Sequence, residues 1–288
     1  MKASDRMSKM YRAALGVVLY QNSIEELTNL FRSIQAMEKS IQENQRSISL
    51  EVFLFDNGDS PMSYFEEVKI STNHHFCVHK LPENKGFGGG HNELMKQVFL
   101  DGVDAYIAVN PDGFFHPRCV EAFFDLSINH DHRALIEARQ FPSEQPKAYD
   151  PMTFETEWCA GACLWISKPV YEATWGFDEG IFMYCEDVDI SWRAQEAGLK
   201  TLLCPKAWFY HDLTDRFDNT PSRQKQQLLG SRYLGYRWNN IVFAHKVELQ
   251  LFKRELISSG DELPSPPEPL NKITRQHKFD FRYAPQRW

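Results

Sequence analysis

The sequence predicts an α/β protein with a mixed, mainly parallel sheet flanked by helices, and the order of its apolar segments is the first reason. Short apolar runs of strand length alternate with longer segments in which apolar residues recur at helical spacing. The second reason is that polar, turn-forming residues directly follow several of these runs. Because ligands of parallel sheets bind beyond the carboxyl ends of the strands, these polar residues are expected to converge on one site.

The first half of the chain is expected to supply four strands. The first is Ala13–Tyr20, an apolar run (AALGVVLY). Ser23 can cap the helix that follows, and Glu26 completes a capping box. The other three are apolar runs at Leu50–Phe55, Phe76–Leu81 and Asp104–Val109. The segment 84–92 (NKGFGGGHN) is expected to be a glycine-rich loop, followed by a helix to about Leu100.

The second half is expected to complete the sheet and then become helical. The pattern predicts a strand, a helix and two short strands, in the order Ala162–Ser167, Glu186–Ala197, Thr201–Cys204 and Ala207–Tyr210. Residues 222–256 are expected to be mostly helical, and 258–269 (SSGDELPSPPEP) has the composition of a linker. The expected units are an α/β domain over 1–221, a helical segment over 222–257, and a Pro/Ser-rich linker with a basic tail over 258–288.

Charge is unevenly distributed along the 288 residues. The chain carries 32 basic and 39 acidic side chains, a net charge of −7, yet residues 222–288 hold 12 basic and 6 acidic groups. The acidic remainder repels phosphate, which excludes a nucleic-acid-binding surface there. The basic end and the amphipathic stretch Ile241–Leu256 are compatible with docking on an anionic membrane or a phosphorylated acceptor, and a merely solvated tail is the alternative.

Three absences indicate the compartment. No run reaches the length of about 18 apolar residues that a membrane span needs, and the polar start (MKASDRMSKMYR) lacks the apolar core of a signal peptide. The six cysteines include no C-x-x-C pair, and no second Cys/His pair joins Cys159 and Cys163 in a zinc site. We therefore expect buried, reduced thiols and a cytoplasmic protein.

The glycine-rich segment resembles a dinucleotide-binding motif only superficially. Residues 86–91 (GFGGGH) match G-x-G-x-x-H, so the third glycine of the fingerprint is missing, and the segment follows the third strand rather than the first. A nicotinamide site is therefore not expected. The glycines still allow the backbone to approach a ligand closely, and Lys85 adds a positive charge for a phosphate. A plain flexible turn is the alternative.

Three polar groups are candidates for chemistry. Asn110-Pro111-Asp112 follows an apolar strand, where a carboxylate suits a divalent cation that bridges phosphate oxygens, although the same tripeptide is a good turn. Glu186 and Asp187 are adjacent carboxylates framed by apolar residues, and one of them can act as a general base. His211 ends a later strand and is either a metal ligand or a hydrogen-bonded structural residue.

In their order along the chain, these motifs resemble those of family 2 glycosyltransferases, which are inverting enzymes of the GT-A fold. They look most like the bacterial rhamnosyltransferases that build surface polysaccharides. The resemblance covers residues 12–240 and leaves out the tail. The matching segments are 55–58 (FDNG), 84–92, 110–112 (NPD), 158–161 (WCAG), 176–179 (GFDE), 182–189 (FMYCEDVD) with Arg193, and His211. It implies that residues 1–221 form a GT-A type nucleotide-diphospho-sugar transferase domain, with a helical C-terminal extension.

For the donor, the resemblance implies a nucleotide-sugar site built from the first half of the chain. Asp56 would contact the base of the nucleotide. Lys85, Gly86, Gly88 and Asn92 would lie along the nucleotide and its phosphates.

For the metal and the catalytic base, the resemblance points to the later motifs. Asn110 and Asp112 occupy the positions of a D-x-D motif, with Asp112 as the metal-binding carboxylate. His211 would be a further ligand of Mg²⁺ or Mn²⁺, as in the related galactofuranosyltransferases. Asp187, or Glu186 beside it, would deprotonate the acceptor hydroxyl. The single carboxylate of the Asn-Pro-Asp motif departs from D-x-D, which puts the strictness of the metal requirement in question.

The activity that the resemblance implies is a metal-dependent, inverting transfer of a sugar to a hydroxyl group. The expected donor is dTDP-L-rhamnose, with a UDP-hexose or UDP-galactofuranose as the alternative. The expected acceptor is a growing glycan on a lipid pyrophosphate, bordered by Trp158 and Gly161, which places the site at the inner face of the cell membrane. Two other classes stay open: a non-catalytic, glycan-binding subunit with the same fold, and a metal-dependent phosphohydrolase.

Overall fold

The computed structural model describes residues 10–58, 60–72, 74–80, 83–145, 147–211 and 220–279. The strands are β1 (Tyr11–Leu19), β2 (Ile48–Asp56), β3 (Cys77–Lys80), β4 (Ala105–Val109), β5 (Gly113–Phe115), β6 (Ala134–Phe141), β7 (Cys163–Ser167) and β8 (Lys200–His211). The helices are α1 (Ile24–Glu43), α2 (Met62–Thr72), α3 (Gly86–Leu100), α4 (Cys119–Ile128), α5 (Lys168–Thr174), α6 (Glu186–Glu196), α7 (Pro221–Arg237) and α8 (Ile241–Lys253). A short 3₁₀ turn follows at Gly260–Glu262.

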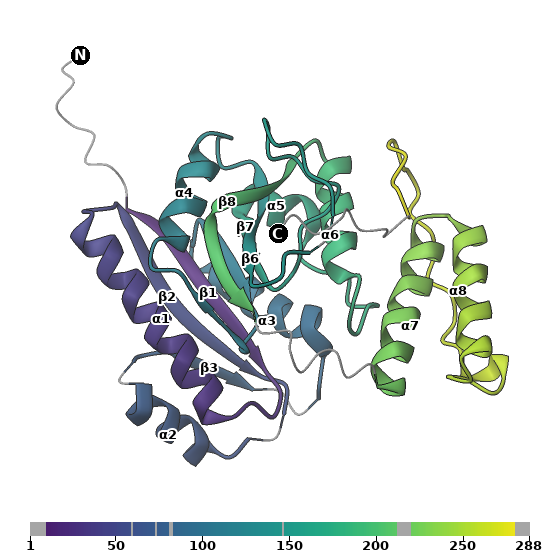
Figure 1. Cartoon of the computed structure of the whole chain (residues 1–288), viewed down its shortest axis with the longest axis horizontal. Coiled ribbons are helices and arrows are strands. Elements are labelled where there is room, and N and C mark those ends of the chain that lie inside the picture. Colours follow the sequence, from purple (N-terminus) through teal and green to yellow (C-terminus); the bar gives the residue numbers. More distant parts are fainter. Residues whose placement is uncertain are drawn as a thin grey trace.

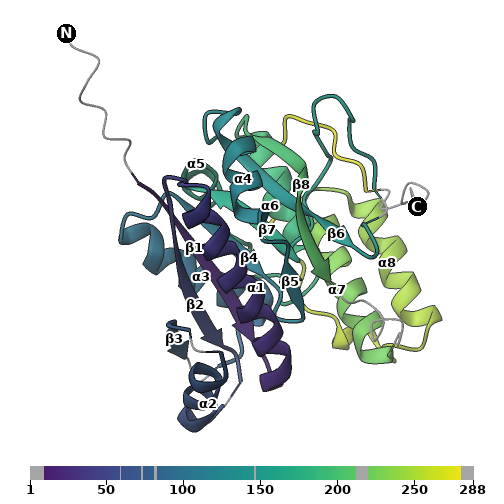
Figure 2. The same cartoon turned by 60° about the vertical axis from the view of Figure 1, so that its left-hand side comes forward.

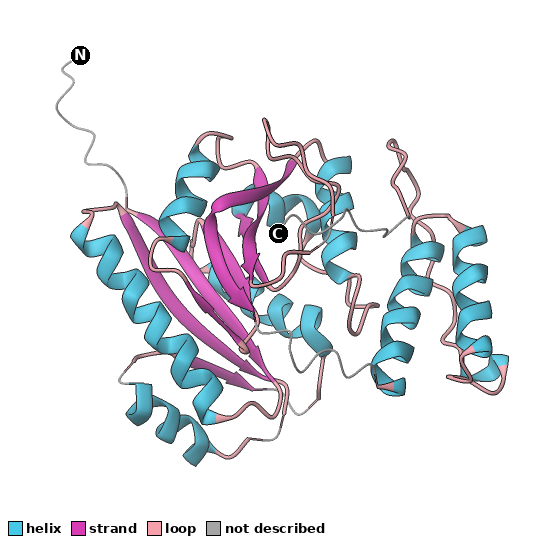
Figure 3. Ribbon diagram, in the orientation of Figure 1, coloured by secondary structure: helices cyan, strands magenta, loops and turns pink. Residues whose placement is uncertain are grey.

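The strands form one sheet in the order β3-β2-β1-β4-β7-β6-β8-β5 (Figure 1, Figure 3). β1 pairs in parallel with β2 on one side and with β4 on the other, and β3 extends this half. β7 runs antiparallel between β4 and β6, and β8 returns parallel to β6. The predicted α/β class with a mixed sheet flanked by helices is confirmed.

Helices cover both faces of the sheet, which is why β1 is apolar on both sides. Val17 belongs to the apolar cluster under α1, and its neighbour Val18 belongs to the cluster under α3. Figure 2 shows α1 lying across β1 and β2. The start of α1 is as predicted, because Ser23 Oγ accepts from the Glu26 N–H at 3.2 Å and Glu26 Oε2 accepts from the Ser23 N–H at 2.8 Å.

The segment expected as a glycine-rich loop is instead the first part of α3. Gly86 has a φ of +69°, and a Cβ at this position would lie 2.0 Å from the carbonyl oxygen of Phe182. A Cβ on Gly88 would lie 2.9 Å from the Cβ of Phe177. The glycines therefore let the helix pack closely against the segment that precedes α6, and they do not form a flexible turn.

The two short strands expected over 201–210 are one strand, β8. Its pairing with β6 does not end at Cys204; it shifts register between Ala138 and Arg139 and then continues. A bulge of this kind interrupts the apolar pattern of a strand without ending the strand. β6 itself was not predicted, because Glu137 and Arg139 disguise its alternation. α2, α4, α5 and β5 were not predicted either.

α7 and α8 form a helical hairpin at one end of the molecule (Figure 1). A third apolar cluster joins this hairpin to α6; its buried members are Val188, Trp192, Leu234 and Trp238. Residues 258–279, expected as a linker and tail, fold back over this cluster. Leu270, Ile273 and Phe279 pack against it, and the backbone N–H of Leu270 donates to the Arg237 carbonyl. The rest of the predicted basic tail lies outside the described residues.

Two predictions drawn from composition can be compared with the structure. Four of the six cysteines are buried and Cys185 is half-buried, but Cys77 on β3 is exposed, so the expectation of buried thiols was wrong there. All six are free thiols. Within the described ranges, no helix is both long and apolar enough to cross a bilayer.

Candidate active site

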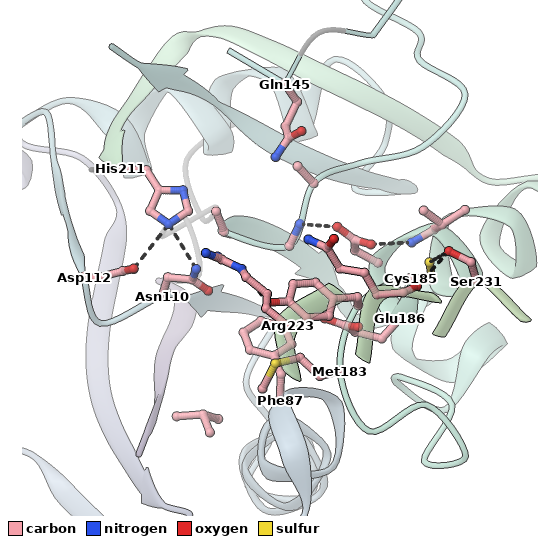
Figure 4. A pocket seen from close by; sticks show the side chains of 18 of the residues that line it. Phe87, Asn110, Asp112, Gln145, Met183, Cys185, Glu186, His211, Arg223 and Ser231 are labelled. Atoms are coloured by element: carbon pink, nitrogen blue, oxygen red, sulfur yellow. Dashed lines mark hydrogen bonds and ion pairs between the residues drawn. The ribbon is translucent and has the colours of Figure 1, made fainter. Parts of the chain in front are cut away.

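A pocket of about 1500 Å³ opens at the carboxyl ends of β1, β4 and β8. It is larger than the roughly 300–1,000 Å³ typical of single small-molecule sites, so it has room for two substrates. The start of α6 and one face of the α7–α8 hairpin complete its wall. Seven of the predicted residues line it: Asn110, Asp112, Trp158, Gly161, Glu186, Asp187 and His211. Figure 4 shows the Asp112–His211 group and Glu186 on opposite sides of this space.

Asp112 and His211 lie side by side in the pocket, although they belong to different parts of the chain. Asp112 follows β4, His211 ends β8, and their Oδ1 and Nε2 atoms are 3.3 Å apart. Asn110 Nδ2 lies 3.2 Å from the same Nε2. On the other side of the ring, Nδ1 lies 3.1 Å from Oε1 of the buried Gln140. With Gln140 Oε1 accepting from Nδ1–H, the Nε2 lone pair accepts from Asn110 Nδ2 and is available to a cation bound beside Asp112.

This pair has the chemistry of a partial divalent-cation site. Carboxylate oxygen and imidazole nitrogen both bind Mn²⁺, and Mg²⁺ accepts one or two protein carboxylates with the remaining ligands from phosphate and water. Among the described residues, no group of three or more His, Cys, Asp and Glu side chains is arranged for a metal. Asp112 and His211 therefore fit a cation that would take its other ligands from a bound diphosphate. Gln140, which orients His211, has no signal in the sequence that sets it apart.

The two adjacent carboxylates at the start of α6 lie on the opposite side of the pocket, where Glu186 is buried and Asp187 is half-buried. Tyr184 (φ 68°) and Cys185 (φ 70°) are both in the left-handed conformation, a strained turn of the kind that clusters at functional sites. Asp187 Oδ2 accepts from the Gly161 N–H at 3.0 Å, and Oδ1 accepts from the Val188 N–H at 2.9 Å. The turn into α6 thus places Asp187 in contact with Gly161, in the predicted acceptor segment.

Burial and the charges around them give the two carboxylates different pKa values. Burial, and then the charge of Asp187, raises the pKa of Glu186 to about 8. Burial also raises the pKa of Asp187, but hydrogen bonds from the Gly161 and Val188 N–H groups and the charge of Lys147 oppose that rise. At neutral pH, Glu186 is therefore mostly protonated and Asp187 is the carboxylate that can accept a proton.

A buried ion pair behind the pocket holds the segment that contacts Asp187. Lys147 Nζ lies 2.7 Å from Glu137 Oε2 and also donates to the Trp158 carbonyl, while its Nζ sits 4.2 Å from the centre of the Trp158 ring. The same Glu137 oxygen accepts from the Ala160 N–H. Both side chains are less than one tenth exposed. Sequence reasoning missed this pair; a glutamate inside an apolar strand was the one signal available.

Arg223 is a second residue that the sequence did not single out. It comes from the first turn of α7 and its Nε donates to the Tyr184 hydroxyl at 3.0 Å. Figure 4 shows its guanidinium directed across the pocket toward Asn110. Arg223 and Arg254 are the Arg or Lys side chains among the described residues that line the pocket, and both belong to the C-terminal hairpin region.

Asp56 does not line the pocket. Its side chain is fully buried, and its oxygens accept from the N–H groups of Gly58 and Ser60 and from the Ser60 hydroxyl, each at 3.1 Å. Lys80 lies 3.3 Å from the same carboxylate. In the structure Asp56 closes the turn after β2, and its contact with a nucleotide base stays a prediction.

The predicted donor residues on α3 are also outside the pocket. Lys85, the residue that precedes α3, pairs with Glu93 of that helix. Asn92 binds both backbone groups of Phe177, with its Nδ2 2.9 Å from the carbonyl oxygen and its Oδ1 2.8 Å from the N–H. Together with the packing of Gly86 and Gly88, these contacts clamp α3 to the segment before α6. Phe87 is the residue of this stretch that lines the pocket.

Sequence comparison identifies two named relatives, although no family model matches the sequence. The chain is 26% identical to the N-acetylglucosaminyl-diphospho-decaprenol L-rhamnosyltransferase of Mycobacterium tuberculosis, over 56% of this chain and 66% of the relative. The match thus spans just under two thirds of that relative's length. This chain is also 39% identical to the rhamnosyltransferase WbbL of Escherichia coli K12, over 17% of this chain and 19% of that relative. The predicted resemblance to bacterial rhamnosyltransferases is confirmed.

Several solved glycosyltransferase structures share the fold. GalNAc-T7 with UDP, GalNAc and Mn²⁺ superposes with a TM-score of 0.59 at 12% identity, covering 80% of this chain and 48% of that one. The mannosyltransferase PcManGT of Pyrobaculum calidifontis, in complex with GDP-Man and Mn²⁺, gives 0.56 at 10% identity, covering 87% and 77%. TarS of S. aureus, residues 1–349, gives 0.52 at 15% identity, covering 76% and 65%. The fold is therefore of the GT-A type, as predicted.

Proposed function

Starting from a GT-A fold and a resemblance to bacterial rhamnosyltransferases, we propose that this chain transfers a sugar from a nucleotide diphosphate to an acceptor hydroxyl. The observation that carries the proposal is one pocket with a carboxylate–imidazole pair on one side and the half-buried carboxylate of Asp187 on the other. The finer proposal is L-rhamnose from dTDP-L-rhamnose, delivered to a glycan on a lipid pyrophosphate. Both relatives are named rhamnosyltransferases, and one name contains a diphospho-decaprenol carrier. A UDP-hexose or UDP-galactofuranose is the alternative donor.

Asp187 is the proposed general base. The acceptor oxygen forms a bond to the anomeric carbon, the bond from that carbon to the diphosphate oxygen breaks, and Asp187 takes the hydroxyl proton. One displacement from the opposite face inverts the anomeric configuration. The elevated pKa of Asp187 makes it a better proton acceptor than an exposed aspartate. We assign the base to Asp187 in preference to Glu186, whose pKa burial and the charge of Asp187 raise to about 8.

The departing diphosphate needs positive charge near Asp112. Asp112 and His211 would hold a divalent cation, which supplies Lewis-acid stabilisation of the leaving group when it is bound. Arg223 extends into the same part of the pocket and adds a permanent cation from α7 (Figure 4). Trp158 and Gly161 border the side of Asp187, where the acceptor would bind.

Binding and transfer test this proposal separately. Thermal unfolding is measured with dTDP-, UDP- and GDP-sugars, each with Mg²⁺, with Mn²⁺ and with EDTA. A ligand that binds only the folded state raises the unfolding temperature, so we expect a metal-dependent shift with one nucleotide family. Asp187→Asn should lower transfer by about 10²–10⁴-fold and keep that shift, because it removes a base and no donor contact. Asp112→Asn should lose the metal dependence of the shift.

Glu172→Gln, on the exposed surface of α5, is the matched control and should change neither measurement. If no nucleotide sugar raises the unfolding temperature, the non-catalytic subunit is favoured. Donor hydrolysis that proceeds equally without acceptor would favour the phosphohydrolase. If Asp187→Asn abolishes the donor shift, Asp187 belongs to the donor or metal site instead.

A further inference from the structure

The outer face of α8 combines exposed apolar side chains with lysines. Ala244, Val247 and Leu251 are the buried residues of α8. On its other side, Ile241, Val242, Leu249 and Phe252 are 50%, 66%, 57% and 40% exposed. Val242, Leu249 and Phe252 are spaced seven and three residues apart, which places them along one stripe of a helix. Figures 1 and 2 both show α8 at the margin of the molecule.

The charge of this face is positive. Lys246 and Lys253 are exposed on the same side of α8 as Leu249. Glu248 is the carboxylate of α8, and it is directed toward α7, where Arg232 Nε lies at 2.7 Å and the Tyr236 hydroxyl at 2.9 Å. Every charge that α8 exposes on this face is therefore basic. Other large exposed apolar residues, such as Ile70 and Leu100, lie on separate helices.

This combination fits a bilayer better than a protein partner. Lysine is depleted in the centres of protein interfaces, whereas at a membrane surface its long stem lies along apolar surface and its ammonium group reaches anionic headgroups. The exposed apolar side chains of this face would lie at the acyl boundary, and its two lysines would lie at the level of the headgroups. This arrangement is complementary to an anionic leaflet.

The same helix also forms part of the pocket. Gln250 and Arg254 line the pocket from the flank of α8 that lies between its buried and outer faces. A bilayer against the outer face would therefore lie beside the pocket. That placement suits an acceptor whose sugar is attached to a membrane lipid.

We propose that the outer face of α8, formed by Ile241, Val242, Leu249, Phe252, Lys246 and Lys253, docks on a bilayer that contains anionic lipids. The reason for docking rests on the proposed lipid-linked acceptor. The docking itself requires neither donor nor acceptor, so it can succeed or fail independently of the proposed activity.

The test is co-sedimentation of the full chain with vesicles of phosphatidylcholine, alone or mixed with phosphatidylglycerol. We expect binding to the mixed vesicles that weakens as salt is raised. The double variant Leu249→Gln, Phe252→Gln should bind at least tenfold less at every salt concentration. Lys246→Gln should bind about fivefold less at low salt and differ little at high salt.

The double variant Ile70→Gln, Leu100→Gln is the matched control, since it also removes two exposed apolar side chains, one from α2 and one from α3. Its binding should equal that of the parent chain, and circular dichroism should show all variants folded. The proposal is overturned if the parent chain does not bind the mixed vesicles, or if the control loses as much binding as the α8 variant. It is also overturned if the α8 variant changes only the oligomeric state and leaves vesicle binding unchanged.

Discussion

Glu186 and Asp187 are neighbours in the sequence, yet the fold gives them different acidities. Asp187 receives two backbone N–H groups and lies within the field of Lys147, and Glu186 Oε2 has no hydrogen-bond partner among the described residues. Adjacent carboxylates predict that one of them is functional, but sequence alone does not say which. The Gly161 N–H binds Asp187 and not Glu186, through a contact between segments 26 residues apart, and this contact supports the assignment of Asp187 that we propose.

Lys147 is expected to be a positioning residue for Asp187. Lys147→Met removes the cation that lowers the pKa of Asp187, so that pKa should rise. A base works only when deprotonated, and the acidic limb of the pH profile of kcat should therefore move to higher pH. The variant also leaves Glu137 buried without its partner, which should lower the free energy of unfolding by about 3–5 kcal/mol.

Two further variants separate position from charge. Lys147→Arg keeps the charge and should return the acidic limb toward its original pH. Lys200→Met breaks an exposed pair with Glu155 and should change the free energy of unfolding by less than about 1 kcal/mol, with no change in the profile. An unmoved acidic limb in a folded Lys147→Met protein would falsify the positioning role.

At the scale of elements, the sequence predicts the strands that are buried on both faces, and also β3, whose residues are exposed or half-buried. β1, β2, β4 and β7 each contain a run of at least five buried residues, because helices or neighbouring layers cover both sides of them. β6 carries buried polar side chains that find partners far away in the chain, as Glu137 does in Lys147 and Gln140 does in His211. Such partners are set by tertiary structure, so the periodicity of β6 was misleading.

The glycines of α3 are a second case in which tertiary contacts decide the local structure. Composition predicted a loop, and what the glycines provide is room for Phe182 and Phe177 against a helix. The predicted donor residues of this stretch do not line the pocket, and their contact with a nucleotide stays a prediction. The motifs after β4, at the start of α6 and at the end of β8 line one pocket, as expected for polar residues near the carboxyl ends of strands, and their chemical roles stay predictions.

Gly86→Ala tests this packing. Its φ of +69° carries a backbone penalty for alanine of about 1–2 kcal/mol, and the Phe182 carbonyl would have to move as well. Gly198→Ala is the control, because its φ is +76° and nothing lies within 4 Å of its Cβ position. In urea unfolding we expect Gly86→Ala to lose about 1–3 kcal/mol more than Gly198→Ala. Equal losses would mean that α3 and the segment before α6 are not held together as described.

At the scale of the whole molecule, the C-terminal segment ties the hairpin to the GT-A body. Glu196, at the end of α6, accepts from Thr274 N–H and hydroxyl at 2.8 and 2.6 Å, and from the Arg275 N–H at 3.0 Å. His277 lies 3.0 Å from the same carboxylate and stacks on Trp192. Low hydropathy and prolines made this stretch resemble a linker, because its anchors are a few apolar side chains and hydrogen bonds to distant residues, among them Glu196 and Arg237.

Glu196→Ala should therefore release residues 258–279 from the body. Burial alone would raise the pKa of Glu196, but the hydrogen bonds from Thr274, His277 and Arg275 lower it from 4.5 to about 2. A carboxylate with a depressed pKa stabilises the folded state above its unfolded pKa, and that stabilisation is lost as pH falls from 4.5 toward 2. The difference in free energy of unfolding between parent and variant should be about 1–3 kcal/mol at neutral pH and should shrink over that interval.

Limited proteolysis supplies the second measurement, because a released segment exposes backbone to cleavage. We expect Glu196→Ala to be cut within 258–279 faster than the parent chain, and Glu172→Ala, an exposed glutamate of α5, to be cut at the parental rate. Since this segment covers the cluster that joins α6 to α7, its release should also loosen the wall that presents Arg223 to the pocket. Donor binding weaker in Glu196→Ala than in Glu172→Ala would link the tail to the site. Equal cleavage and equal stability at all pH values would show that Glu196 does not hold the segment.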